Sequence, residues 1–266
     1  MSGTTPRPLL IDCARQQLRV IGALVIRELR TRFGQRRMGY VWLFLEPLLF
    51  SVLILMIHST RGRFSGDGLR STFEFFSIGY LLFFKFRGIV NRAGNAIGAN
   101  RGLLFHRQVT LPDLFVARHI IEGVAVTGVL GIFLVAAIAL GGDPPDSPIQ
   151  MIGALVLMLL LAQGIAFVVG ALTAEWESLD RIIMLLSILL LPFCGVFFMV
   201  DWLPGWMQDI VVWVPTVHVF ELLREGQFGD KVTATYDLRY LAYWILVPHL
   251  LGLAALRITR QRIGLE

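Results

Sequence analysis

Long apolar runs constrain the fold of this 266-residue chain more than any other feature. A helix needs roughly 20 apolar residues to cross a bilayer. Only 16% of the residues are charged, whereas soluble domains average about a quarter. The sequence therefore predicts a single all-α integral membrane domain over residues 1–266. Its six transmembrane helices are expected at about residues 39–57, 72–90, 114–140, 149–172, 182–200 and 238–256.

A seventh apolar run, 210–223, is too short to cross a membrane as a helix. Pro204 and Pro215 divide the surrounding chain into short pieces. Non-helical backbone survives at membrane depth only where protein or a water-filled cavity surrounds it. Segment 202–228 is therefore predicted to form a re-entrant pair of short, half-inserted helices.

Basic residues are distributed unevenly around the predicted spans. Arginines crowd the segment before the first span, recur after the second span, and end the chain at 257–262. Six spans place these regions on one side, and Lys and Arg mark the cytoplasmic side. The arginines within 61–70 and the acidic loop 174–180 run against this assignment. The balance still predicts two cytoplasmic termini, and arginines that flank spans are a poor match to nucleic-acid binding.

Segment 16–38 has the pattern of an amphipathic helix. Its apolar residues recur at spacings of three and four, which gathers them on one stripe: Leu18, Ile21, Val25, Leu29 and Phe33. Such a helix lies in the membrane interface and binds anionic lipid. It could also border a cytoplasmic entrance at which its arginines meet an anionic substrate, and the two roles are compatible.

Several charged residues fall within predicted spans, and Glu46 and Lys85 are the two that bear on function. Glu46 precedes Pro47, which should kink the first span. A carboxylate at that depth should face the bundle interior or a cavity and have a partner, although a structural hydrogen bond would also satisfy it. Lys85 raises the same question, or it extends its amine to the nearby interface.

The loop 100–112 places Leu103, Leu104 and Phe105 between basic residues. A surface loop gains nothing by exposing three large apolar side chains. A groove on a partner protein or a position flat on the lipid would each accommodate them.

Taken in order, these features resemble the type-2 ABC exporter permeases, specifically the capsule and O-antigen polysaccharide export subunits of the KpsM/Wzm type. The resemblance covers nearly the whole chain. Its most specific parts are REL-x-TRF at 27–33 with GYVW-x3-EP at 39–47, and E-x2-R-x-G-x-FG at 221–229. The N-x2-LL-x7-P pattern at 100–112 and LPGW at 203–206 also belong to it.

The resemblance implies the ABC-2 (type V) exporter fold, as a homodimer in the bacterial inner membrane with two copies of a separate ATPase. Segment 16–38 would be the interface helix beside the cytoplasmic mouth, and 202–228 would cap the periplasmic end. Segment 100–112 would be the coupling helix that contacts the ATPase. The candidate contacts there are Asn100, Leu103, Leu104, Phe105, His106 and Arg107.

The implied function is export of lipid-linked, anionic capsular polysaccharide, together with a periplasmic adaptor and an outer-membrane channel. Candidates for attracting the anion at the entrance are Arg27, Arg30, Arg36, Arg37, Lys85 and Arg92. Aromatic faces can stack on sugar rings. The candidates for lining the channel are Glu46, Phe73, Phe76, Tyr80, Phe83 and Phe84, although packing or lipid contact would equally explain the aromatic residues.

The chain has no G-x4-GK-[ST] phosphate-binding loop, so ATP and Mg²⁺ are expected on the partner ATPase and no cofactor or metal on this chain. By itself it is not expected to be an enzyme. A close rival is an O-antigen or teichoic-acid exporter of the same superfamily. A membrane enzyme acting on lipid-linked glycan is a weaker one, because its best hint is His218 and Glu221, which a pair of satisfied hydrogen bonds explains more simply.

Overall fold

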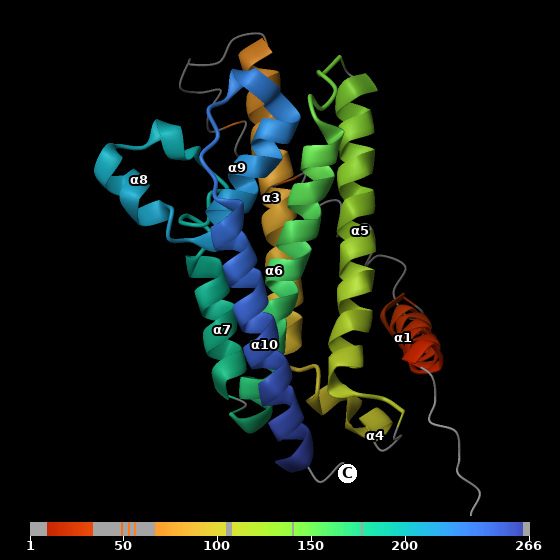
Figure 1. The fold of residues 1–266 in the computed structure, drawn as a ribbon. Coiled ribbons are helices and arrows are strands. Elements are labelled where there is room, and N and C mark those ends of the chain that lie inside the picture. Colours follow the sequence, from red (N-terminus) through yellow and green to blue (C-terminus); the bar gives the residue numbers. More distant parts are fainter. Residues whose placement is uncertain are drawn as a thin grey trace, which may run out of the picture.

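The described part of the chain is a bundle of long helices with shorter helices at its sides (Figure 1). No strand occurs among these residues, which confirms the all-α prediction for them. Three helices, α5 (Leu111–Ala139), α6 (Pro148–Glu175) and α10 (Leu238–Arg262), are long and apolar enough to cross a membrane. The computed structural model describes residues 10–33, 49, 53, 56, 67–104, 108–139, 141–176 and 178–262.

Four predicted spans correspond to long helices. Spans 114–140, 149–172 and 238–256 match α5, α6 and α10, and span 72–90 lies within α3 (Asp67–Ala93). Each helix extends past at least one predicted end, because apolar length marks the membrane-embedded part and not the helix itself. The predicted span 39–57, which includes Glu46, lies outside the described residues apart from three isolated positions.

Helices α6 and α10 pack closely because glycines lie at their crossing. A Cβ on Gly252 would be 2.4 Å from the Phe167 Cβ and 3.0 Å from the Val168 backbone nitrogen. A Cβ on Gly164 would be 2.6 Å from Nδ1 of His249. Small residues allow membrane helices to approach backbone to backbone. Dispersion contacts then hold the helices together, because lipid provides no hydrophobic driving force between them.

The prediction of a span at 182–200 is wrong in its second half. Helix α7 (Ser178–Leu189) ends after 12 residues, and the chain continues as turns. Pro192 lacks the N–H that a continuing helix needs, and Gly195 has a φ of 95°, which an α-helix does not allow. The prediction was based on the apolar side chains of 190–200, which do not reveal that the backbone there is irregular.

The short helices expected in 202–228 are present as α8 (Gly205–Val211) and α9 (Pro215–Phe228). Pro215 stands in the first turn of α9, where the missing N–H costs nothing. Gly229, with a φ of 54°, ends α9. Most of α9 is buried, and it packs against α6, whereas α8 projects from the side of the bundle (Figure 1).

Helix α1 (Leu10–Phe33) lies across the side of α5 (Figure 1). The predicted apolar stripe is only partly packed, because Leu18 is 69% exposed and Leu29 39% exposed. Leu24, outside that stripe, is instead the buried contact with the core. The helix is rotated because its polar side chains also bond to α5, which leaves the two exposed leucines free to meet lipid.

The expected single helix over 100–112 is also wrong. A short turn, η1 (Gly98–Asn100), leads into α4 (Arg101–Leu104), and α5 already begins at Leu111. Asp113 accepts a hydrogen bond from the Thr110 N–H at 2.8 Å, as in a capping box. This Thr-x-x-Asp signal in the sequence marks a helix start, and it would have shown that 111–112 belong to α5.

Candidate functional site: a polar junction at helix α1

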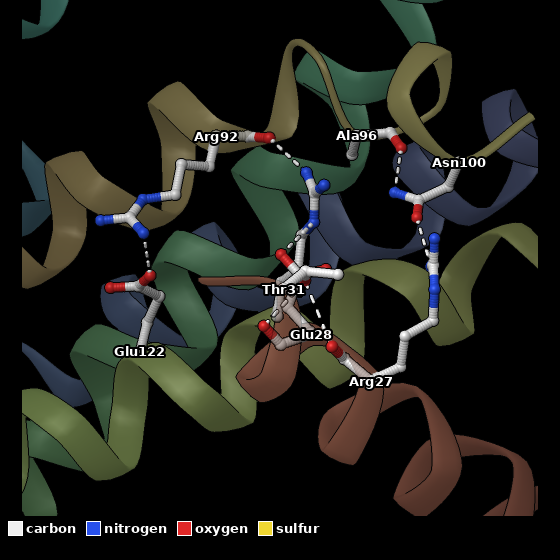
Figure 2. Close-up of polar contacts among 8 residues, drawn as sticks. Arg27, Glu28, Thr31, Arg92, Ala96, Asn100 and Glu122 are labelled. Atoms are coloured by element: carbon white, nitrogen blue, oxygen red, sulfur yellow. Dashed lines mark hydrogen bonds and ion pairs between the residues drawn. The ribbon is translucent and has the colours of Figure 1, made fainter. Parts of the chain in front are cut away.

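A set of polar contacts joins α1 to the 98–110 segment and to α5; these contacts and their residues are called the α1 junction below. Arg27 Nη1 donates a hydrogen bond to Asn100 Oδ1 at 2.9 Å, as Figure 2 shows. Asn100 is buried, and its amide nitrogen donates to the Ala96 carbonyl oxygen at 2.9 Å. A predicted substrate-entrance residue and a predicted ATPase-contact residue are therefore in direct contact.

Two further contacts attach α1 to α5, and neither was predicted from the sequence. Glu28 forms an ion pair with Arg118, with 3.3 Å between Oε1 and Nε. Gln17 donates a hydrogen bond to Asp113, the residue that caps the start of α5. Because these contacts lie about three turns apart along α1, they fix its position on α5.

The network continues from α5 to the end of α3. Arg118 Nη1 donates to the Arg92 carbonyl oxygen at 3.1 Å, and Arg92 Nη1 pairs with Glu122 Oε1 at 2.6 Å (Figure 2). The Glu122 side chain is only 6% exposed and that of Arg92 is 42% exposed. A buried carboxylate requires such a counter-charge. Arg92, expected to attract substrate, thus serves first as the partner of Glu122.

Open space lies on both sides of Arg27. A cavity of about 540 Å³ lies between α1 and the 98–110 segment. It is lined by Leu24, Arg27, Leu103 and Val109 among others. A second cavity, of about 760 Å³, is lined by Arg27 and Arg30 along α1. Arg30 is exposed, and Arg36 and Arg37 lie outside the described residues. Arg27 and Arg30 therefore line space that an anion could enter.

The apolar cluster of the loop was expected to be exposed, but its two leucines are not fully exposed in the structure. Leu104 is 2% exposed and belongs to the hydrophobic core of the chain. Leu103 is half-buried against the same core. Burial in its own chain satisfies Leu104 without a partner groove. Phe105, His106 and Arg107 lie outside the described residues.

The Lys85 amine does not extend to the surface of the chain. Its exposed fraction is 0%, and its amine has no hydrogen-bond partner among the described residues. Helix α3 packs against α5 and α6, and these neighbours cover the lysine. The expectation that Lys85 snorkels is therefore wrong for this conformation, and its assignment to a substrate entrance stays a prediction.

The aromatic side chains of α3 pack mostly inside the chain. Phe76, Tyr80 and Phe83 are buried, whereas Phe84 is half-buried and lies 6.2 Å from Tyr80 between ring centroids. The Phe73 side chain lies outside the described part. Among the aromatic channel-lining candidates whose side chains are described, Phe84 is the most exposed.

A second polar site, termed here the α9 clamp, consists of Glu221 and Arg224. The Arg224 guanidinium is fully buried, donates to the carbonyl oxygens of Val196 and Phe198, and lies 3.6 Å from the ring centroid of Phe75. The Glu221 carboxylate accepts from the N–H groups of Val200 at 3.0 Å and Thr235 at 2.9 Å. The clamp thus satisfies backbone groups of the irregular segment that follows α7 and of the loop that follows α9.

His218 also bonds to backbone. Its Nδ1 accepts from the Asp237 N–H at 3.0 Å, and its Nε2 lies 2.8 Å from the Val212 carbonyl oxygen. His218 and Glu221 are therefore both committed to the loops around α9, which removes the best enzymatic hint. Within the described residues, no group of three or more His, Cys, Asp and Glu side chains could hold a metal ion.

Comparison with known proteins places this geometry in context. The family model of the ABC-2 type transporter matches residues 19–228. The chain is 34% identical to the capsule polysaccharide export inner-membrane protein CtrC of Neisseria meningitidis serogroup A, over 94% of each protein. It is 34% identical to the capsule polysaccharide export inner-membrane protein BexB of Haemophilus influenzae, over 91% of each. It is 30% identical to the polysialic acid transport protein KpsM of Escherichia coli, over 91% of this chain and 93% of that protein.

Proposed function

Because the chain belongs to the ABC-2 type transporter family, we propose that it is the permease subunit of an ATP-driven exporter of capsular polysaccharide in the bacterial inner membrane. One observation carries the proposal: the similarity to capsule polysaccharide export proteins extends over more than nine-tenths of each protein compared. Polysialic acid, which the name of KpsM specifies, is a polyanion, so an anionic cargo is the natural inference.

The proposed assembly is a homodimer with two copies of a separate ATPase, a periplasmic adaptor and an outer-membrane channel. Each subunit would have six membrane crossings and cytoplasmic termini, the fifth crossing made by α7 together with the irregular segment that follows it. The α1 junction would lie at the cytoplasmic face, and α8 and α9 at the periplasmic end. An anionic glycan cannot cross hydrocarbon, because its hydroxyl and acidic groups would lose their water. Arg27 and Arg30, which line the cavities beside α1, would attract it electrostatically.

In this mechanism the ATPase acts on the 98–110 segment. The Arg27–Asn100 hydrogen bond would pass a displacement of that segment to α1. The Glu28–Arg118 and Gln17–Asp113 contacts would pass it on to α5. ATP binding on the partner would thus move two elements together, which is how binding energy at one site can alter another.

Reconstitution tests the proposal. Vesicles containing this chain and its ATPase subunit should move lipid-linked capsular polysaccharide into a protected compartment only when ATP is present. Neutral O-antigen and teichoic acid, offered separately, distinguish the rival cargoes. Export by this chain without an ATPase, or chemical turnover of the glycan, would exclude the proposed role.

Loss of the Arg27–Asn100 contact should uncouple ATP hydrolysis from export. For Asn100→Ala we expect export per ATP hydrolysed to fall about fivefold, the scale of a coupling free energy near 1 kcal/mol. Arg27→Ala should act similarly, and the double variant should be no worse than Asn100→Ala alone, because the two residues share one interaction. The measurement is a double-mutant cycle on the export-to-hydrolysis ratio.

Arg19→Ala provides the matched control, since Arg19 is an exposed arginine on the same helix. It should leave the ratio near that of the wild type. Independent, additive losses at positions 27 and 100 would show that their contact does not transmit the movement.

A further inference from the structure

Lys85 is a buried cation that the proposed mechanism leaves unused. It is fully buried on α3, and its amine has no partner among the described residues. Burying an uncompensated charge is costly. An ionisable side chain inside a membrane domain therefore signals a function, and the question is which group compensates it.

The carboxylate of Glu122 lies on the α3 surface beside Arg92. Its Oε2 would be 3.8 Å from a Cβ on Gly88, so it rests against the helix where no side chain intervenes. Lys85, Gly88 and Arg92 follow one another at spacings of three and four, which places them on one face. Along the axis, Lys85 stands about 4.5 Å from Gly88 on one side and Arg92 about 6 Å on the other.

The facing side of α5 also lies near Lys85. His119, one turn from Glu122 on the same face of α5, is within electrostatic range of Lys85. A cavity of about 10 Å³ is lined by Arg92, His119 and Glu122 among others. That is space for roughly one water molecule. The contact between α3 and α5 is thus polar and not fully filled at this level, in contrast to a close-packed apolar interface.

Helix α5 is also the element that the α1 junction would move. Its first turns carry Asp113 and Arg118, which bond to α1 through Gln17 and Glu28. A displacement of α1 and the 98–110 segment towards the bundle would carry α5 along α3. Glu122 would then travel away from Arg92 and towards Lys85.

We propose that Glu122 exchanges its ion-pair partner during the transport cycle, from Arg92 in the conformation described here to Lys85 in the nucleotide-bound conformation. The shift needed is about one helical turn, a displacement known for packed elements that switch between two arrangements. This inference rests on the proposed function, because ATP binding on the partner supplies the movement. The exchange makes Lys85 and Glu122 positioning residues for the second conformation.

The exchange gives Lys85 opposite effects in the two conformations. Without nucleotide the amine has no partner among the described residues, so replacing it with an apolar side chain of similar length should not destabilise the protein and should raise its Tm or leave it unchanged. With nucleotide the same replacement removes the partner of Glu122. A merely structural lysine would instead lower the Tm and the export rate together.

The first test uses Lys85→Met, Glu122→Gln and their combination in the complex with the ATPase subunit, reconstituted in vesicles. For Lys85→Met we expect an export rate about tenfold lower, within the usual range of coupling between sites, with normal complex recovery and an unchanged or higher nucleotide-free Tm. The double variant should export no less than Glu122→Gln. Lys231→Met is the control and should behave as wild type, because Lys231 is an exposed lysine whose ion pair with Asp143 is exposed too.

A Lys85→Met complex that exports normally would overturn the exchange, as would a loss of export that accompanies a lower Tm. If the wild-type complex exports nothing with ATP, the proposed function itself fails. Normal export by both the wild type and Lys85→Met removes only the inference.

Cross-linking tests the movement directly. Cysteine pairs at positions 92 and 122 and at positions 85 and 122 would be introduced after replacement of Cys13 and Cys194. The 92–122 pair should cross-link preferentially without nucleotide, and the 85–122 pair preferentially in the ATP-trapped complex. Cross-linking yields that do not change with nucleotide for either pair would contradict the shift of α5.

Discussion

Replacing Arg224 with methionine should destabilise the folded protein more than any other single change discussed here. The guanidinium donates to two carbonyl oxygens of the irregular segment after α7, at Val196 and Phe198. Methionine leaves both acceptors buried without a donor and leaves Glu221 without a nearby positive charge. The expected cost is about 3–5 kcal/mol, the range for removing one partner from a buried charged network.

The measurement is the Tm of the purified protein in detergent, together with the yield of monodisperse protein. Arg224→Lys should fall between the wild type and Arg224→Met, because lysine keeps the charge but lacks the planar fork that reaches two carbonyls. Arg239→Met, at an exposed arginine, serves as the control. A Tm for Arg224→Met within a degree or so of that of Arg239→Met would mean that the clamp does not stabilise this end of the bundle.

A second large effect is expected from adding one methyl group at Gly252. Its Cβ would approach the Phe167 Cβ to 2.4 Å and the Val168 backbone nitrogen to 3.0 Å, and backbone cannot move aside without separating α6 from α10. Gly252→Ala should therefore lower the stability by about 1–3 kcal/mol, as overpacking does elsewhere. Thermal unfolding in detergent would measure the change.

Gly131→Ala is the matched control, because a Cβ on Gly131 meets nothing within 4 Å. Alanine favours a helix over glycine by about 1 kcal/mol, so this variant should be neutral or slightly more stable. The same substitution thus has opposite expected signs at two helical positions. Equal effects at both would refute the close packing of α6 and α10.

The long helices were predictable because apolar length is a local property. α3, α5, α6 and α10 correspond to four of the six predicted spans, and Pro204 and Pro215 correctly indicated the division of 202–228 into α8 and α9. Apolar character alone failed for 182–200, where the side chains suit a membrane but Pro192 and Gly195 do not suit a helix. In that segment the helix-breaking proline and glycine were better predictors of the backbone than the apolar composition.

The candidate site was predicted residue by residue but not as an arrangement. Arg27 and Asn100 were assigned separate roles, and their contact joins residues 73 positions apart. Glu28 and Arg118 carried no signal in the sequence, since an ion pair between distant helices leaves no periodic pattern. Lys85 could be placed on α3 but not in its interior, because burial depends on which neighbours cover that face.

By itself the sequence determined the helical class, the long helices α3, α5, α6 and α10, and the family, since apolar length, helical spacing and motifs are properties of contiguous residues. Only the tertiary structure decided that Arg224 supports the backbone after α7, that Leu104 belongs to the core, and that Glu122 of α5 pairs with Arg92 of α3. Those outcomes depend on how helices distant in the sequence are rotated and packed together. A rotation of one helix changes every partner on its surface without changing a residue of its sequence.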